Sequence, residues 1–139
     1  MAATTEELLK GIKETDDLNK FFALHESDFV NILPHEYLNE LISIKKMTVS
    51  DVVKNSGSGE YVYKIFKGER NASRDILISI SLGMNLSLDE TQLLLRVSKF
   101  AVLDPRDKRD GVIIYALTHS LTVFETDDLL DENNFTTLK

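Results

Sequence analysis

Residues 47–83 read MTVSDVVKNSGSGEYVYKIFKGERNASRDILISISLG, and this stretch is the most informative part of the chain. Thr48 and Asp51 form a T-x-x-D pattern, which is typical of a helix start because the two side chains bond the free N–H groups there. Gly57 tolerates a positive φ and therefore ends this first helix. A second helix is expected over residues 59–67. The pattern predicts two short helices that are joined by a tight turn.

The second helix has an apolar side and a polar side. Three apolar residues gather on one side, namely Val62, Ile65 and Phe66. The other side follows the i, i+3, i+4, i+7 spacing of a single helical stripe, and its residues are Glu60, Tyr63, Lys64 and Lys67. A short helix that rests on another and turns a polar, partly basic stripe outward is suited to the major groove of DNA.

The run IFKGERNASRDIL, residues 65–77, resembles the end of the helix-turn-helix domain in the Cro and lambda-repressor-like (XRE) family. In that family the recognition helix ends in an I-x-x-G-x-R-x-P-S pattern. The matching positions here, with alanine in place of the usual proline, are Ile65, Gly68, Arg70, Ala72 and Ser73. One bacterial subgroup of the family also resembles this chain in the segments TTEELLKGI, YLNELI, GMNLSLDETQLLL and LDPRDKRDGVIIYAL.

The resemblance implies an all-α fold, built as an XRE-like helix-turn-helix bundle. We expect that bundle over residues 34–100, preceded by an N-terminal helical extension over residues 1–33. A C-terminal helical hairpin over residues 101–139 is expected to pack on the bundle, so that the whole chain forms a single compact unit. The resemblance also implies a sequence-specific, DNA-binding transcriptional regulator in a bacterial cytoplasm.

Two groups of contacts with double-stranded DNA are expected. Phosphate contacts, which set register rather than specificity, are assigned to Lys46, Thr48, Lys67 and Arg70. Base-edge contacts are assigned to Tyr61, Tyr63 and Lys64, where the lysine ammonium is suited to guanine O6 or N7. Because one such helix reads only a few base pairs, we expect a homodimer.

The charge distribution favours a specific reader over a general DNA-coating protein. The 139 residues carry a net charge of −7. Residues 34–86 carry seven basic and six acidic side chains, whereas residues 1–33 and 87–139 each have a net charge of −4. Broad electrostatic binding of nucleic acid needs a basic protein, so only the central segment is suited to phosphate. With no cysteine, no run of eighteen apolar residues and an acidic N-terminus, the sequence favours a cytoplasmic protein without a membrane span.

The second half of the chain contains a duplication. Residues 74–100 align with residues 109–135 after a shift of 35, and ten of the 27 positions are identical. Each copy begins with Arg-Asp and contains a capping box, so each predicts a helix, a short turn and a second helix. The repeat is interpreted mainly as an extension of the core. As an alternative, the second copy offers an acidic face to a partner protein through Asp127, Asp128, Asp131 and Glu132.

Two local expectations concern the ends of this repeat. Asp104 and Pro105 are interpreted as the start signal of the helix that contains GVIIYAL. The tail over residues 133–139 is expected to fray, because its sequence offers little to hold it.

Catalytic chemistry is not predicted. The three histidines lack metal-ligand spacing, the acidic run lacks the pattern of a calcium loop, and no cofactor motif is present. The remaining alternative to DNA binding is a protein-interaction adaptor that keeps the helix-turn-helix fold. Glu60 in the outward stripe, a turn one residue shorter than usual and the net acidity favour that alternative.

Overall fold

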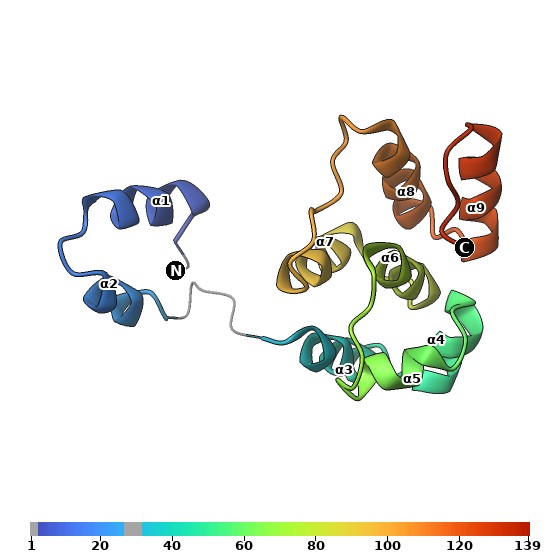
Figure 1. The fold of residues 1–139 in the computed structure, drawn as a ribbon, viewed down its shortest axis with the longest axis horizontal. Coiled ribbons are helices and arrows are strands. Elements are labelled where there is room, and N and C mark those ends of the chain that lie inside the picture. The colour runs from blue at the N-terminus through green and yellow to red at the C-terminus, as the bar shows by residue number, and fades with distance from the viewer. Residues whose placement is uncertain (1–2, 27–31) are drawn as a thin grey trace. The chain divides into compact units, whose positions relative to one another are not determined.

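The computed structural model describes residues 3–26 and 32–139, and its regular structure in these ranges is entirely helical (Figure 1). The predicted all-α class is therefore confirmed. The chain divides into two compact units, residues 1–31 and residues 32–139. This division differs from the expectation of one compact unit, because the first unit has a small core of its own. The predicted hairpin over residues 101–139 belongs to the second unit.

The first unit consists of α1 (Thr5–Glu14) and α2 (Leu18–Leu24). Thr4 caps α1, since its hydroxyl oxygen accepts from the Glu7 N–H at 3.1 Å. Phe21 is the one buried side chain among the described residues of this unit, and its ring lies against Gly11. A pair of short helices around a single aromatic ring explains why these residues form a separate unit.

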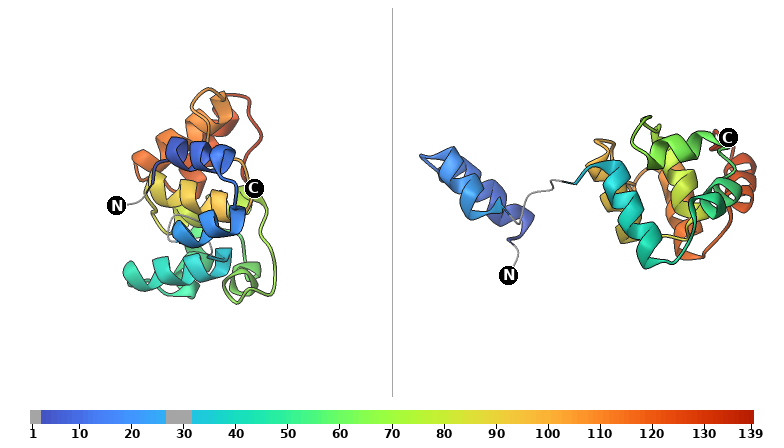
Figure 2. Two further views of the ribbon diagram at one scale, coloured as in Figure 1. Left: turned by 90° about the vertical axis from the view of Figure 1, so that its left-hand side faces the viewer. Right: turned by 90° about the horizontal axis from the view of Figure 1, so that it is seen from below.

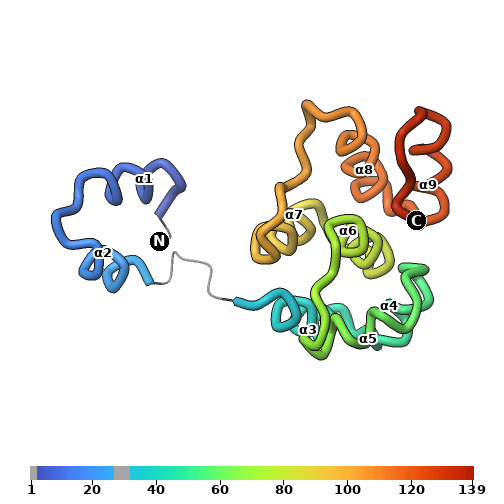
Figure 3. Tube along the Cα trace, viewed as in Figure 1, coloured from blue at the N-terminus to red at the C-terminus, as the bar shows by residue number. Residues whose placement is uncertain are grey.

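The second unit is built around one central helix (Figures 1 and 2). Its elements are α3 (Pro34–Ile44), α4 (Val49–Ser56), α5 (Tyr61–Phe66), α6 (Arg74–Gly83), α7 (Leu88–Val97), α8 (Lys108–Thr118) and α9 (Val123–Glu132). In α6 every residue from Leu77 to Leu82 is buried. A helix that is buried all round must be surrounded by other elements, and α6 packs against α4, α7, α8 and α9. The trace in Figure 3 shows α6 between these helices.

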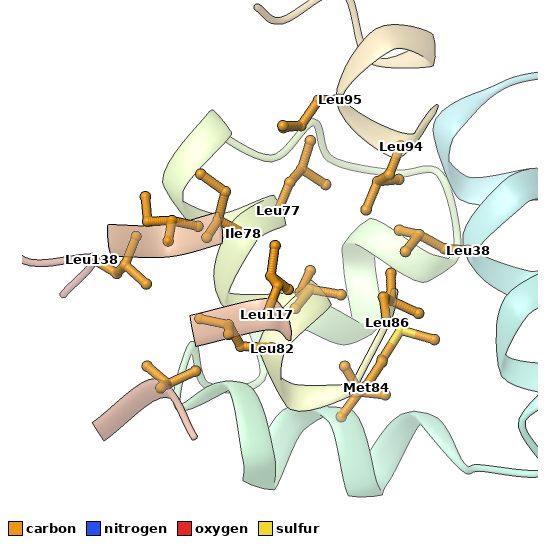
Figure 4. Packing of buried hydrophobic residues seen from close by; sticks show 14 of the residues in the cluster. Leu38, Leu77, Ile78, Leu82, Met84, Leu86, Leu94, Leu95, Leu117 and Leu138 are labelled. Carbon is orange, nitrogen blue, oxygen red and sulfur yellow. The ribbon is translucent and has the colours of Figure 1, made fainter. Parts of the chain in front are cut away.

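Two serines inside α6 are buried with their hydroxyl groups hydrogen-bonded. The Ser79 hydroxyl donates to the Asp75 carbonyl at 3.0 Å, and the Ser81 hydroxyl donates to the Leu77 carbonyl at 2.8 Å. Because both hydroxyls find a partner one turn back, the surrounding core remains apolar. Figure 4 shows Leu77, Ile78 and Leu82 of α6 among leucines of neighbouring helices.

The duplication predicted from the sequence is confirmed as two helical hairpins, α6–α7 and α8–α9. The two turns share a left-handed residue, Asn85 with φ 53° and Ser120 with φ 54°. In both copies a capping box follows this residue, as the sequence predicts. The same connector, with a left-handed Lys46 before the Thr48 capping box, joins α3 to α4.

The two copies are joined by exchanged ion pairs. Arg74 of the first copy bonds Asp110 of the second at 3.0 and 3.1 Å, and Arg109 of the second bonds Asp75 of the first at 3.1 Å. The equivalent arginine in each copy thus pairs with the aspartate of the other copy. The Arg-Asp dipeptide at the start of each copy therefore links the two hairpins through ion pairs.

Two expectations about the ends of the second copy are wrong. The helix starts at Lys108, and its cap is Asp107 rather than Asp104, because the intervening residues form a turn in which the Asp107 N–H donates to the Asp104 carbonyl at 3.0 Å. The tail is also anchored. Leu138 is buried, and its N–H donates to Asp127 Oδ1 at 2.7 Å. These partners lie 11 residues apart, so the local sequence gave no sign of them.

Candidate nucleic-acid interface

The first element of the candidate site is the start of α4. The Thr48 hydroxyl oxygen accepts from the Asp51 N–H at 3.1 Å, and Asp51 Oδ2 accepts from the Thr48 N–H at 3.0 Å. These bonds hold the pKa of the Asp51 carboxyl below its usual value, the backbone N–H having the largest effect. Thr48 is exposed, as is Lys46 in the connector before it. The helix start predicted from the T-x-x-D pattern is confirmed.

The turn between α4 and α5 contains two left-handed glycines. Gly57 ends α4 with φ 65°, as expected, and Gly59 has φ 74°. A residue with positive φ cannot be part of a right-handed helix, so α5 begins after Gly59, at Tyr61. It ends at Phe66, shortly before Gly68, whose φ is 76°. The helix predicted over residues 59–67 is therefore shorter at both ends.

The two sides of α5 are separated as predicted. Val62, Ile65 and Phe66 are buried, with 0%, 3% and 4% of their surface exposed. On the opposite side Tyr63 is 37% exposed, and Lys64 is also exposed. The outward side of this helix is thus free to contact another molecule.

Tyr61 lies differently from the other predicted base-contacting residues. It is half-buried and packs against the hydrophobic core. Its hydroxyl donates to the Asn71 carbonyl at 2.6 Å. This side chain connects α5 to the segment that follows it, which differs from the expectation that it faces outward.

Asn39 of α3 holds the far end of α5, a role that the sequence did not suggest. Its side-chain amide donates to the carbonyl of Phe66 at 2.8 Å and to that of His35 at 2.7 Å. Beyond α5, the N–H groups of Glu69 and Arg70 both donate to the Lys64 carbonyl, at 2.9 and 3.3 Å. These hydrogen bonds therefore hold in place the backbone that carries the exposed side chains of Lys67 and Arg70.

The basic residues of the central segment have different roles. Lys45 pairs with Glu90 at 3.2 Å, and Arg74 pairs with Asp110. In contrast, five exposed cations make no ion pair with any described residue, namely Lys46, Lys54, Lys64, Lys67 and Arg70. Two exposed acids, Glu60 and Glu69, lie beside them in sequence. The central segment thus presents five unpaired cations, and the negative charges of Glu60 and Glu69 partly offset the positive charge around α5.

We also searched the described part of the chain for a metal-binding group and for a membrane-spanning helix. No group of three or more histidine, aspartate or glutamate side chains there lies close enough to hold a metal ion. No helix within residues 3–26 or 32–139 has both the length and the apolar content to cross a membrane. Comparison with protein-family models, with curated proteins and with solved structures finds no match to this chain.

Proposed function

We propose that this chain is a sequence-specific, DNA-binding transcriptional regulator, acting in a bacterial cytoplasm. In this proposal α3 to α7 form an XRE-like helix-turn-helix bundle, with α4 and α5 as its two motif helices. The observation that carries the proposal is the outward side of α5. It presents Tyr63 and Lys64 to solvent, while the opposite side is buried. A helix held in this way can enter the major groove without disturbing the core.

The proposed contacts follow from exposure and from the bonds already made. Tyr63 and Lys64 would meet base edges, where the ammonium donates to guanine O6 or N7. The phosphate contacts would come from Lys46 and Thr48 at the start of α4 and from Lys67 and Arg70 beyond α5. Tyr61 supports α5 instead, since its hydroxyl is bonded to the backbone. A homodimer would present two such helices to neighbouring half-sites.

Selection of fragments from a random double-stranded DNA library tests this proposal. The purified full chain should enrich one motif at low salt. Lys64→Ala should weaken binding to that motif by about 1–3 kcal/mol and relax preference at one base position. Its stability should stay within about 0.5 kcal/mol of the parent, because the side chain is exposed.

Arg96→Gln is a matched control. Arg96 is an exposed cation of α7 without an ion pair among the described residues, and α7 packs against α3, α6 and α8. This variant should retain the affinity and the motif of the parent. Failure of the parent chain to bind any DNA at low salt would reject the proposal and leave the interaction adaptor.

A further inference from the structure

The second helical hairpin has an open groove. It has a volume of about 580 Å³ and runs between α8 and α9. Its main lining residues are Gly111, Val112, Tyr115, Leu129, Asn133 and Phe135. Tyr115 is 50% exposed, so an aromatic ring stands at the surface of this groove. The ring stacks on that of His119, with the two centroids 3.9 Å apart, so it is held in place while half of its surface stays open. An exposed aromatic ring that is held in position is a common anchor for a partner.

The surface of the first hairpin, α6–α7, that corresponds to this groove is not open. With the shift of 35, Tyr115 corresponds to Ile80 and Leu129 corresponds to Leu94. Both counterparts are 0% exposed. The helices that carry them are covered by others, since α4 packs against α6 and α3 packs against α7. On the first copy, therefore, this surface is covered by helices.

The groove of the second copy differs from its counterpart in charge. Glu132 stands where the first copy has Val97, which is buried, and Asp128 stands where it has Leu93. At 100° per residue both acids flank Leu129 on its solvent side. Both are exposed, and neither forms an ion pair within the described residues. Among the described residues that line the groove, one is a cation, Lys108 of α8.

We propose that this groove docks a basic amphipathic helix of a partner protein. The apolar stripe of that helix would cover Tyr115 and Leu129, as α3 and α4 cover the first copy. Its lysine or arginine residues would face Asp128 and Glu132, which replace the apolar contacts of the first copy. The recognition is helix-in-groove binding with a charged border. It does not depend on DNA binding by α5.

Two labelled synthetic peptides test the proposal against the full chain by fluorescence anisotropy. Both carry the same leucine stripe at i, i+3, i+4 and i+7, and they differ only in lysine or glutamate along the flanks. The lysine peptide should bind at least about tenfold more tightly than the glutamate peptide. Equal affinity of the two peptides, or no binding of the lysine peptide at millimolar concentration, would overturn the proposal.

A plug variant, in which a larger side chain fills the groove, tests whether the peptide binds there. A side chain added at Gly111 meets no atom within 4 Å of its Cβ, so Gly111→Gln should fold like the parent. The new side chain occupies the groove and should weaken the lysine peptide about tenfold. Unchanged affinity with the plug would show that the peptide binds elsewhere. Self-association of the parent that the plug abolishes would instead identify a second copy as the occupant and overturn the proposal.

The charge border has its own matched control. Asp128→Asn combined with Glu132→Gln should weaken the lysine peptide by about three- to tenfold. Asp131 lies on the same helix but points away from Leu129 at 100° per residue, so Asp131→Asn should change affinity by less than about twofold. Equal losses for each charge removed in the two variants would show that only the net charge of the protein matters.

Discussion

At the residue scale, Glu60 is the side chain that most opposes the proposed DNA contact. It is exposed, it precedes α5, and its side chain makes no capping hydrogen bond. A carboxylate beside phosphates repels them by on the order of 1 kcal/mol at short range in water. We predict that Glu60→Gln strengthens binding to random DNA about threefold to tenfold. Gel-shift titration measures this, with Asp131→Asn as the control for net charge. Unchanged affinity would mean that this end of α5 stays away from the DNA backbone.

A second residue-scale prediction concerns acid stability and Asp110. Burial raises the pKa of this carboxyl, but the hydrogen bonds from Arg74 and from the Asp104 N–H outweigh it and hold the pKa below 3.8, its usual value. A lowered pKa in the folded state means that the unfolded state binds the proton more readily. The stabilisation is therefore present above about pH 4 and is lost as the pH falls further.

Asp110→Asn should remove this contribution. Since Arg74 loses its charged partner while only partly exposed, we expect a loss of about 2 kcal/mol at pH 7. The variant should also show a flatter decline of stability below pH 4. Urea unfolding at a series of pH values checks both effects. A variant that declines as steeply as the parent would assign the acid sensitivity to other carboxyls.

At the element scale, α5 depends on tertiary contacts. Its six residues are too few for a helix that is stable alone. Three of them are buried, and Asn39 holds its last carbonyl. We predict that Phe66→Ala destabilises the second unit by about 3–5 kcal/mol, since the ring is 4% exposed. Thermal unfolding measures the loss.

Phe124→Ala provides the matched aromatic truncation. Phe124 is 64% exposed, and its one described ring contact is with Lys139, whose Nζ lies 4.7 Å from the ring centroid. Its removal should cost at most about 1 kcal/mol. If the two variants unfold at the same temperature, Phe66 does not support the core in solution.

Elements were predictable where their signals are local. Capping boxes such as that of Thr48 join residues three apart, so the sequence alone placed most helix starts. The duplication was also readable, because both copies keep their caps and apolar positions. The exchange of partners between Arg74 and Asp110 was not, since these residues lie 36 positions apart. For the same reason the sequence alone did not show which basic residues of the central segment form ion pairs and which do not.

At the scale of the whole molecule, the charge distribution limits where DNA can bind. Each end of the chain has a net charge of −4, and the central segment is the only one that is not acidic. The acidic ends repel phosphate and so disfavour binding through the rest of the surface. Affinity should therefore depend on the few unpaired cations around α4 and α5.

This limit leads to a prediction for salt dependence. Each phosphate contact releases condensed counterions and contributes about −0.9 to the slope of log affinity against log salt concentration. With Lys46, Lys67 and Arg70 at phosphates, and with the Lys64 ammonium in the groove also displacing a counterion, one subunit should show a slope of about −3 to −5. Lys67→Gln should reduce the slope by about one, whereas Arg96→Gln should leave it unchanged. A slope near zero, or an equal reduction in the two variants, would show that these cations do not hold phosphate and that α5 does not enter the groove.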